Sequence, residues 1–111
     1  KKFFLFEDGT NVDFKNIENF NDLPIVYGEK KKFNSFYSDL KKIKFPTENV
    51  KAFHFFGIER WDIILKNDRV VKLPSKNYLK SLKNFLLIKN KNSFEKYEIF
   101  DYRINDQLIL N

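Results

Sequence analysis

Apolar residues recur at helical spacing in two segments of the chain. In residues 33–43 they fall at i, i+3, i+4, i+7 and i+10, with lysine, serine and aspartate between them, which predicts one buried helical face. This helix is expected to end at Phe45-Pro46, because a residue before proline is pushed out of helical geometry. A second helix is predicted after Pro74, with Ser75 as its N-cap. Its expected buried stripe consists of Tyr78, Leu82, Phe85 and Leu86.

Runs rich in aromatic and β-branched residues predict strands around these helices. Residues 1–14 predict a hairpin broken by a turn at residues 7–10, and residues 66–69 predict the tight turn of a second hairpin. Residues 15–29 predict an irregular connection, anchored by the apolar side chains of residues 23–26. The other predicted strands are residues 50–56, 60–65, 70–73, 99–104 and, after a polar break, 108–110. This order predicts an α+β fold with two amphipathic helices packed on a mostly antiparallel or mixed β-sheet.

The length of the chain bounds its organisation. Its 111 residues, of which 42% are hydrophobic, suffice for one modest core, so we expect a single domain spanning residues 1–111. No run approaches the roughly 20 consecutive apolar residues of a membrane helix. Because the chain begins with Lys1-Lys2 and not with methionine, we expect it to be a piece of a longer protein, in which an anchor or export signal can lie upstream.

The residue types exclude several kinds of chemistry. The absence of cysteine excludes disulfides, thiol catalysis and zinc–thiolate sites, and with a single histidine no metal or other cofactor is expected. That histidine, His54, lies among phenylalanines, and no serine or acid at a recognisable spacing supports a role as general base. The three glycines are isolated, so the chain has no glycine-rich phosphate loop. We therefore expect no enzymatic activity.

The net charge of +6 would suit an anionic partner such as nucleic acid or a lipid surface. Lysine outnumbers arginine 18 to 3, and asparagine, isoleucine and phenylalanine are also abundant, which favours a codon bias acting on the whole chain. Proteins that read nucleic acid use arginine for bidentate contacts, and most aromatic residues here occupy expected core positions. A nucleic-acid-binding module with a lysine and aromatic surface is the alternative function, whereas the preferred interpretation has no nucleic-acid partner.

The stretch ERWD at residues 59–62 places two acids, an arginine and the one tryptophan of the chain side by side. Because side chains alternate along a strand, Arg60 and Asp62 share one face while the tryptophan points to the other. The same pair returns in reverse order as Asp101 and Arg103. If the two strands are antiparallel neighbours, each arginine faces the aspartate of the other strand, and the pairs help to fix the register at roughly 0.2–1 kcal/mol each. This structural interpretation is preferred to catalysis.

Four stretches carry a family resemblance that spans nearly the whole chain. They are FLFEDG at residues 4–9, DLPIVYGE at 22–29, the segments RWD, LKN and VKLP within 60–74, and FDYR at 100–103. In this order they resemble the opening hairpin, the connection into the first helix, the hairpin ahead of the second helix and a late strand of one domain. That domain is the extracytoplasmic β domain of bacterial cell-division proteins of the FtsQ/DivIB family. Asp68 stands where the family often has glycine, which leaves the turn type open.

The resemblance implies a non-enzymatic scaffold on the periplasmic side of the cytoplasmic membrane, within the divisome that builds the septum. It also implies that the full-length protein carries a single membrane helix and a polypeptide-transport-associated domain upstream of this one. The implied partners are small bitopic proteins of the FtsB and FtsL type, with a segment of FtsB adding as a strand to the C-terminal edge of the sheet. No small-molecule substrate is implied.

The resemblance also implies which residues bind the partner. The apolar run at residues 108–110 lacks the lysine or proline that usually blunts a free sheet edge, so it is either covered as an ordinary core strand or serves as a docking site. The implied partner-binding residues are Gln107, Leu108, Ile109, Leu110 and Asn111, with Tyr102 and Arg103 in the neighbouring strand. Residues with an expected structural role are Arg60, Trp61, Asp62, Pro74 and Asp101.

Overall fold

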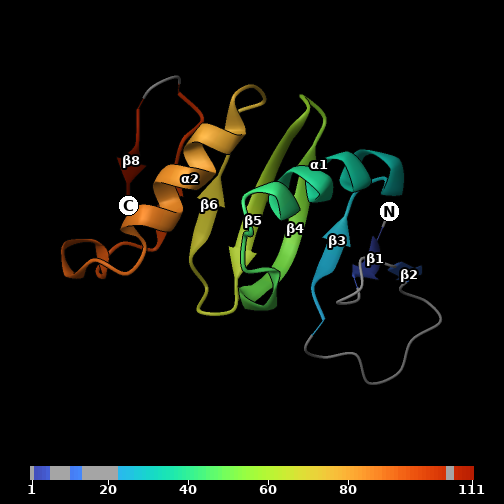
Figure 1. Cartoon of the computed structure of the whole chain (residues 1–111), viewed down its shortest axis with the longest axis horizontal. Coiled ribbons are helices and arrows are strands. Elements are labelled where there is room, and N and C mark those ends of the chain that lie inside the picture. Colours follow the sequence, from blue (N-terminus) through green and yellow to red (C-terminus); the bar gives the residue numbers. More distant parts are fainter. Residues whose placement is uncertain (1, 6–10, 14–22, 105–106) are drawn as a thin grey trace.

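The computed structural model of the chain describes residues 2–5, 11–13, 23–104 and 107–111 (Figure 1). In these ranges eight strands form one sheet, in the order β2-β1-β3-β4-β5-β6-β7-β8. The strands are β1 Lys2–Leu5, β2 Asn11–Asp13, β3 Ile25–Tyr27, β4 Val50–Phe56, β5 Arg60–Leu65, β6 Val70–Lys72, β7 Ile99–Asp101 and β8 Ile109–Leu110. The helices are α1 Lys30–Lys42 and α2 Tyr78–Ile88, with short 3₁₀ helices at Thr47–Asn49 and Asn92–Phe94.

Two parallel strand pairs decide where the helices lie. Strands β3 and β4 are parallel and joined through α1, and β6 and β7 are parallel and joined through α2, while the other neighbours are antiparallel. Strands β3 and β6 run in the same direction, and both connections step the same way along the sheet. Because such crossovers are right-handed, both helices must cover the same face. Figure 1 shows α1 and α2 side by side on one face of the sheet.

A row of inward-facing side chains crosses this helix-covered face. In register from β1 to β7, each strand in turn places one apolar residue opposite that of its neighbour. Each member of this row has 0% of its surface exposed. Leu110 on β8, opposite the last member, continues the row to the edge of the sheet. We call these residues the buried row: Phe3, Val26, Phe53, Ile63, Val71 and Phe100.

Both helices press apolar side chains onto the buried row. The buried residues of α1 are Phe33, Phe36, Tyr37 and Leu40, and those of α2 are Leu82, Phe85 and Ile88. The helices also contact each other, since the Tyr78 hydroxyl donates a hydrogen bond to Asp39 and its ring lies 5.3 Å from that of Phe36. Burial raises the pKa of Tyr78.

In the described part of the chain, neither helix has the length and apolar character needed to span a bilayer.

Most elements occur where the sequence predicts them. The α+β class, both helices, the antiparallel pairing of β1 with β2 and the strands β4, β5 and β6 are confirmed. The sheet is mixed, because the β3–β4 and β6–β7 pairs are parallel. The turn predicted at residues 7–10, the polar break at 105–106 and most of the connection predicted at 15–22 lie outside the described residues.

Three predictions are wrong in detail. Residues 25–27 form strand β3 instead of an irregular connection, because β1 and β4 supply hydrogen-bonding partners on both sides. Ser75 is exposed and does not cap α2, because the helix begins two residues later, after Asn77 in a left-handed conformation with φ 60°. The strand predicted at residues 99–104 ends at Asp101, the last β7 residue that faces β8.

In the turn between β5 and β6, the backbone conformation of the third residue, Asp68, is one that glycine adopts more easily. Asp68 has a φ of 69°, in the left-handed region that costs a residue with a Cβ atom some free energy. The side chain of Asn67 accepts a hydrogen bond of 3.0 Å from the Arg69 N–H, which helps to close the turn. The turn is therefore formed without glycine, but under backbone strain at one position.

We predict that Asp68→Gly raises the free energy of unfolding by about 0.5 kcal/mol, because glycine adopts positive φ without steric cost. The contact that Asp68 makes with Lys51, at 3.4 Å between two exposed side chains, contributes little to this balance. Asp68→Ala should instead lower the free energy by about 1 kcal/mol, because alanine lacks the side-chain oxygen that helps aspartate at positive φ. Urea denaturation followed by circular dichroism measures both, and destabilisation by glycine would contradict the prediction.

Candidate partner-binding edge

Strand β8 is the last strand of the sheet, and its inner side is fully engaged with β7. The N–H of Asn111 donates to the Ile99 carbonyl at 3.1 Å, and the Asn111 carbonyl accepts from the N–H groups of Glu98 and Ile99 at 2.8 and 3.1 Å. Backbone groups alternate in direction along an antiparallel strand, so the N–H and C=O of Leu110 point away from β7. No described strand pairs with that outer side. The edge is therefore open for backbone hydrogen bonds.

The side chains of the edge also alternate. Leu108 and Leu110 are half-buried against the core, whereas Ile109 faces the open side of the sheet and is 39% exposed. Gln107 and Asn111 are exposed. The structure thus places the predicted residues 107–111 together at one sheet edge, with apolar side chains on both faces of it.

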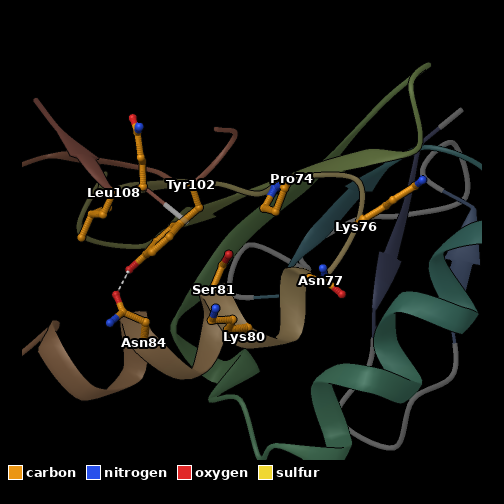
Figure 2. A pocket seen from close by; sticks show the side chains of 9 residues that line it. Pro74, Lys76, Asn77, Lys80, Ser81, Asn84, Tyr102 and Leu108 are labelled. Atoms are coloured by element: carbon orange, nitrogen blue, oxygen red, sulfur yellow. Dashed lines mark hydrogen bonds between the residues drawn. The ribbon is translucent and has the colours of Figure 1, made fainter. Parts of the chain in front are cut away.

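A cavity of about 360 Å³ lies beside this edge, between α2 and the segment that leads into β8 (Figure 2). In Figure 2 the Tyr102 ring and Leu108 lie on the strand side of the cavity, opposite Ser81 and Asn84 of α2. Lys76 lies at the other end, beyond Pro74. The full lining comprises Pro74, Lys76, Asn77, Lys80, Ser81, Asn84, Tyr102, Gln107 and Leu108.

Tyr102 connects β7 with both β6 and α2. Its hydroxyl donates a hydrogen bond of 2.7 Å to the Asn84 Oδ1, and its N–H donates one of 2.8 Å to the Lys72 carbonyl. Burial raises the pKa of Tyr102, so the hydroxyl remains a donor at neutral pH. Tyr102 and Arg103 follow β7 instead of forming part of it, so the expectation that they lie in the strand next to β8 is wrong. Asp101 is the last residue of β7 and pairs with Ile109 of β8.

Each aspartate–arginine pair forms between residues two apart in the sequence and not between strands. The expected cross-strand exchange is wrong because β6 separates β5 from β7. Arg60 donates to Asp62 at 2.7 Å, and Arg103 donates to both carboxylate oxygens of Asp101 from Nε, at 2.9 and 3.1 Å. Lys72 on β6 is the cross-strand neighbour of both aspartates. The result is one line of alternating charge across the open face of the sheet.

The pair on β5 is buried and has a structural role. Arg60 and Asp62 are 8% and 7% exposed, and Arg60 also donates to the Leu73 carbonyl at 3.2 Å and lies over the Phe56 ring at 4.5 Å. It thereby holds the end of β6 ahead of the buried Pro74. Satisfied buried charges of this kind fix a local structure.

Trp61 points to the opposite face and closes the core under α1. Its ring stacks on Phe36 at 5.1 Å with an interplanar angle of 10°. It also leaves no room for a side chain at Gly28, where a Cβ atom would come within 3.1 Å of the indole and 2.9 Å of the Phe55 Cβ. The glycine at the end of β3 is therefore required by close packing.

Arg69 is a structural residue whose partners the sequence did not indicate. Its guanidinium donates to the carbonyls of Lys89, Phe94 and Glu95 at 2.9–3.1 Å and lies 5.4 Å from the Phe100 ring centroid. It therefore ties the segment after α2 to the base of β7. This clamp supports the strand on which β8 rests.

His54 lies on β4, with its ring stacked on that of Phe56. It is exposed on the open face of the sheet, with its ring 5.3 Å from Tyr27 and 4.8 Å from Phe56. Its cross-strand neighbour Asp62 is engaged by Arg60. Within the described residues, no group of three histidine or acidic side chains is placed to hold a metal ion.

The fold is a small α+β domain in which no described strand pairs with the outer side of the last strand, β8. The chain matches the family model "Cell division protein FtsQ/DivIB, C-terminal" over residues 3–103, and it belongs to this family. FtsQ/DivIB proteins are non-enzymatic components of the cell-division machinery, so the domain has a scaffold role in division. The family is associated with the membrane at the septum. A search of curated proteins gave no match.

We predict that Asp101→Asn destabilises the domain by about 1 kcal/mol at neutral pH, and that this difference vanishes in acid. The Arg103 guanidinium beside Asp101 holds the pKa of that carboxyl below its usual range. A lowered folded-state pKa adds stability that is present above the unfolded-state pKa, near 4, and is lost as the pH falls through the folded-state value. Urea denaturation at a series of pH values measures this, and a difference that stays constant on acidification would contradict it.

We also predict that Arg60→Ala lowers the free energy of unfolding by about 3 kcal/mol, because the buried Asp62 then lacks its partner. The matched double variant Arg60→Met/Asp62→Leu should lie within about 1 kcal/mol of the unmodified protein, since no charge is left buried. Guanidinium denaturation of all three proteins tests this. If the double variant were as unstable as the single one, packing of the arginine stem and not the ion pair would be the dominant contribution.

Proposed function

We propose that this domain is a non-enzymatic divisome scaffold that binds small bitopic division proteins of the FtsB and FtsL type by strand addition at β8. The observation that carries the proposal is the free outer side of β8, where the N–H and C=O of Leu110 point away from β7. In strand addition, main-chain hydrogen bonds supply affinity and alternate side-chain positions supply specificity. Membership of a division family supports a partner from the same machinery.

The residue types at this edge favour a site where a partner strand binds over an edge that is only exposed to solvent. Free edges are usually blunted by lysine, proline or a bulge, and residues 107–111 contain none of these residue types. Ile109 presents an apolar side chain to solvent at the end of the sheet. An added strand would cover it and extend the buried row beyond Leu110.

The cavity beside the edge adds a charge preference to the proposal. Lys76 and Lys80 line it, and no acidic side chain of the described residues does. A partner whose chain continues past the added strand towards α2 would therefore bind better if it placed an acidic side chain in the cavity. Complementary charges of this kind contribute mainly to specificity and to the rate of association.

The same family membership supports the setting that we propose. We place the domain on the periplasmic side of the cytoplasmic membrane, at the division septum, in a full-length protein held by a single upstream membrane helix. The proposal includes no small-molecule substrate, no cofactor and no nucleic acid. Its partners are proteins that reach the domain from the same membrane.

The direct test is a titration of isotope-labelled protein with the extracytoplasmic segment of the FtsB-type protein of the same organism, alone and with the FtsL-type segment. We expect backbone amide shifts concentrated in residues 107–111 and in β7, with smaller shifts along α2 at the cavity. Shifts confined to β2, at the other end of the sheet, would contradict the site. Absence of shifts with a folded domain would contradict partner binding itself.

We predict that Ile109→Lys weakens binding of the FtsB-type segment by about tenfold, while the free energy of unfolding changes by less than about 0.5 kcal/mol. The physical reason is that a lysine at a sheet edge opposes the pairing of another strand. The matched control is Ile58→Lys, which changes another exposed isoleucine, 71% exposed in the turn between β4 and β5. Calorimetric titration measures affinity, and equal losses of stability and binding would show that Ile109 is a core residue.

A further inference from the structure

The lysines of the chain are concentrated on the helix side of the sheet. Segments 30–44 and 76–91, which contain α1 and α2, hold 11 of the 21 lysine and arginine residues but only one of the 15 acidic residues. A codon bias would raise the lysine content throughout the chain, but it would not remove acids from these two segments. Because both helices lie on one face of the sheet, these charges add up on one side of the molecule (Figure 1).

Helix stability accounts for the lysines in the last turn of α1, Lys41 and Lys42, which complement the helix dipole, but not for those in its first turn. The first turn of α1 contains three lysines, Lys30, Lys31 and Lys32, and no acidic residue lies in the first turn of either helix. The N-terminal end of a helix carries a partial positive charge and favours acids, so lysines there oppose helix formation. An ion pair with Glu59 offsets this for Lys32.

An exposed leucine interrupts the lysines on the outer ridge of α2. Lys80, Lys83 and Leu87 recur at i, i+3 and i+7, on the side opposite the buried Leu82 and Phe85. Leu87 is 73% exposed. A large apolar side chain flanked by lysines on one ridge is typical of helices that lie at a membrane–water interface.

We propose that the outer side of the two helices, the lysine face, binds the headgroups of anionic phospholipids, with Leu87 reaching the acyl boundary. We define the lysine face by Lys31, Lys42, Lys80, Lys83 and Leu87. Both helical segments lack arginine, the side chain that nucleic-acid recognition prefers, whereas lysine suffices for attraction to an anionic bilayer. This surface goes beyond the scaffold function. Lys80 borders both surfaces, because it also lines the cavity, whereas the other four residues of the lysine face do not line it.

The test is co-sedimentation of the protein with vesicles made of equal parts phosphatidylcholine and phosphatidylglycerol, and with vesicles of phosphatidylcholine alone. We expect binding to the anionic vesicles only, weakening as salt is raised. The variant Lys31→Gln/Lys42→Gln/Lys83→Gln should bind about a hundredfold more weakly. The matched control Lys51→Gln/Lys66→Gln/Lys96→Gln removes the same charge from exposed positions outside both helical segments, and it should bind as the unmodified protein does.

The other outcomes overturn the proposal in distinct ways. Equal weakening in the two triple variants would show that net charge and not this face is responsible. Binding to a DNA oligonucleotide without binding to anionic vesicles would assign the lysine face to nucleic acid.

Leu87→Ser should reduce vesicle binding several-fold, and an unchanged affinity would exclude insertion of Leu87. None of the three lysines changed here lines the cavity, so binding of the FtsB-type segment measured in parallel separates this proposal from the scaffold function.

Discussion

The structure depends on one constraint: a sheet that is covered by helices on a single face must keep a continuous apolar row on that face. Each of the six strands β1, β3, β4, β5, β6 and β7 contributes one fully buried residue to this row, in register with its neighbours. Because strand side chains alternate, the row also decides which residues face the open side. The line of charge through Asp62, Lys72 and Asp101 occupies that side for this reason.

The sequence predicted those elements whose signal is local. The helical spacing of Phe33, Phe36 and Leu40 is complete within α1, and the strands β4 and β5 are long enough to show aromatic and branched runs. Strand β3 was missed because three residues between Pro24 and Gly28 carry no pattern of their own, and only pairing with β1 and β4 makes them a strand. The start of α2 was missed because Asn77 adopts a left-handed conformation that the sequence pattern does not indicate.

The candidate site was predictable in part. The family resemblance implied that residues 107–111 form the C-terminal edge, whereas the apolar run at 108–110 left a covered core strand and a docking site both open, and β8 does end the sheet. The partners of the arginines were not predictable, because the position of β6 between β5 and β7 is a property of the whole topology. The cavity was missed as well, although Asn77, Ser81 and Asn84 recur at i, i+4 and i+7 and form a polar stripe beside the apolar one.

The direction of the buried row has a mechanical consequence. It runs at right angles to the strands, from β1 near the beginning of the chain to β8 at its end. A pull between these two ends acts along the interstrand hydrogen bonds, which separate one at a time when they are loaded in this direction. The interlocked rings and branched side chains beneath the helices therefore bear the tension, and the Arg69 clamp reinforces the row at its β7 end.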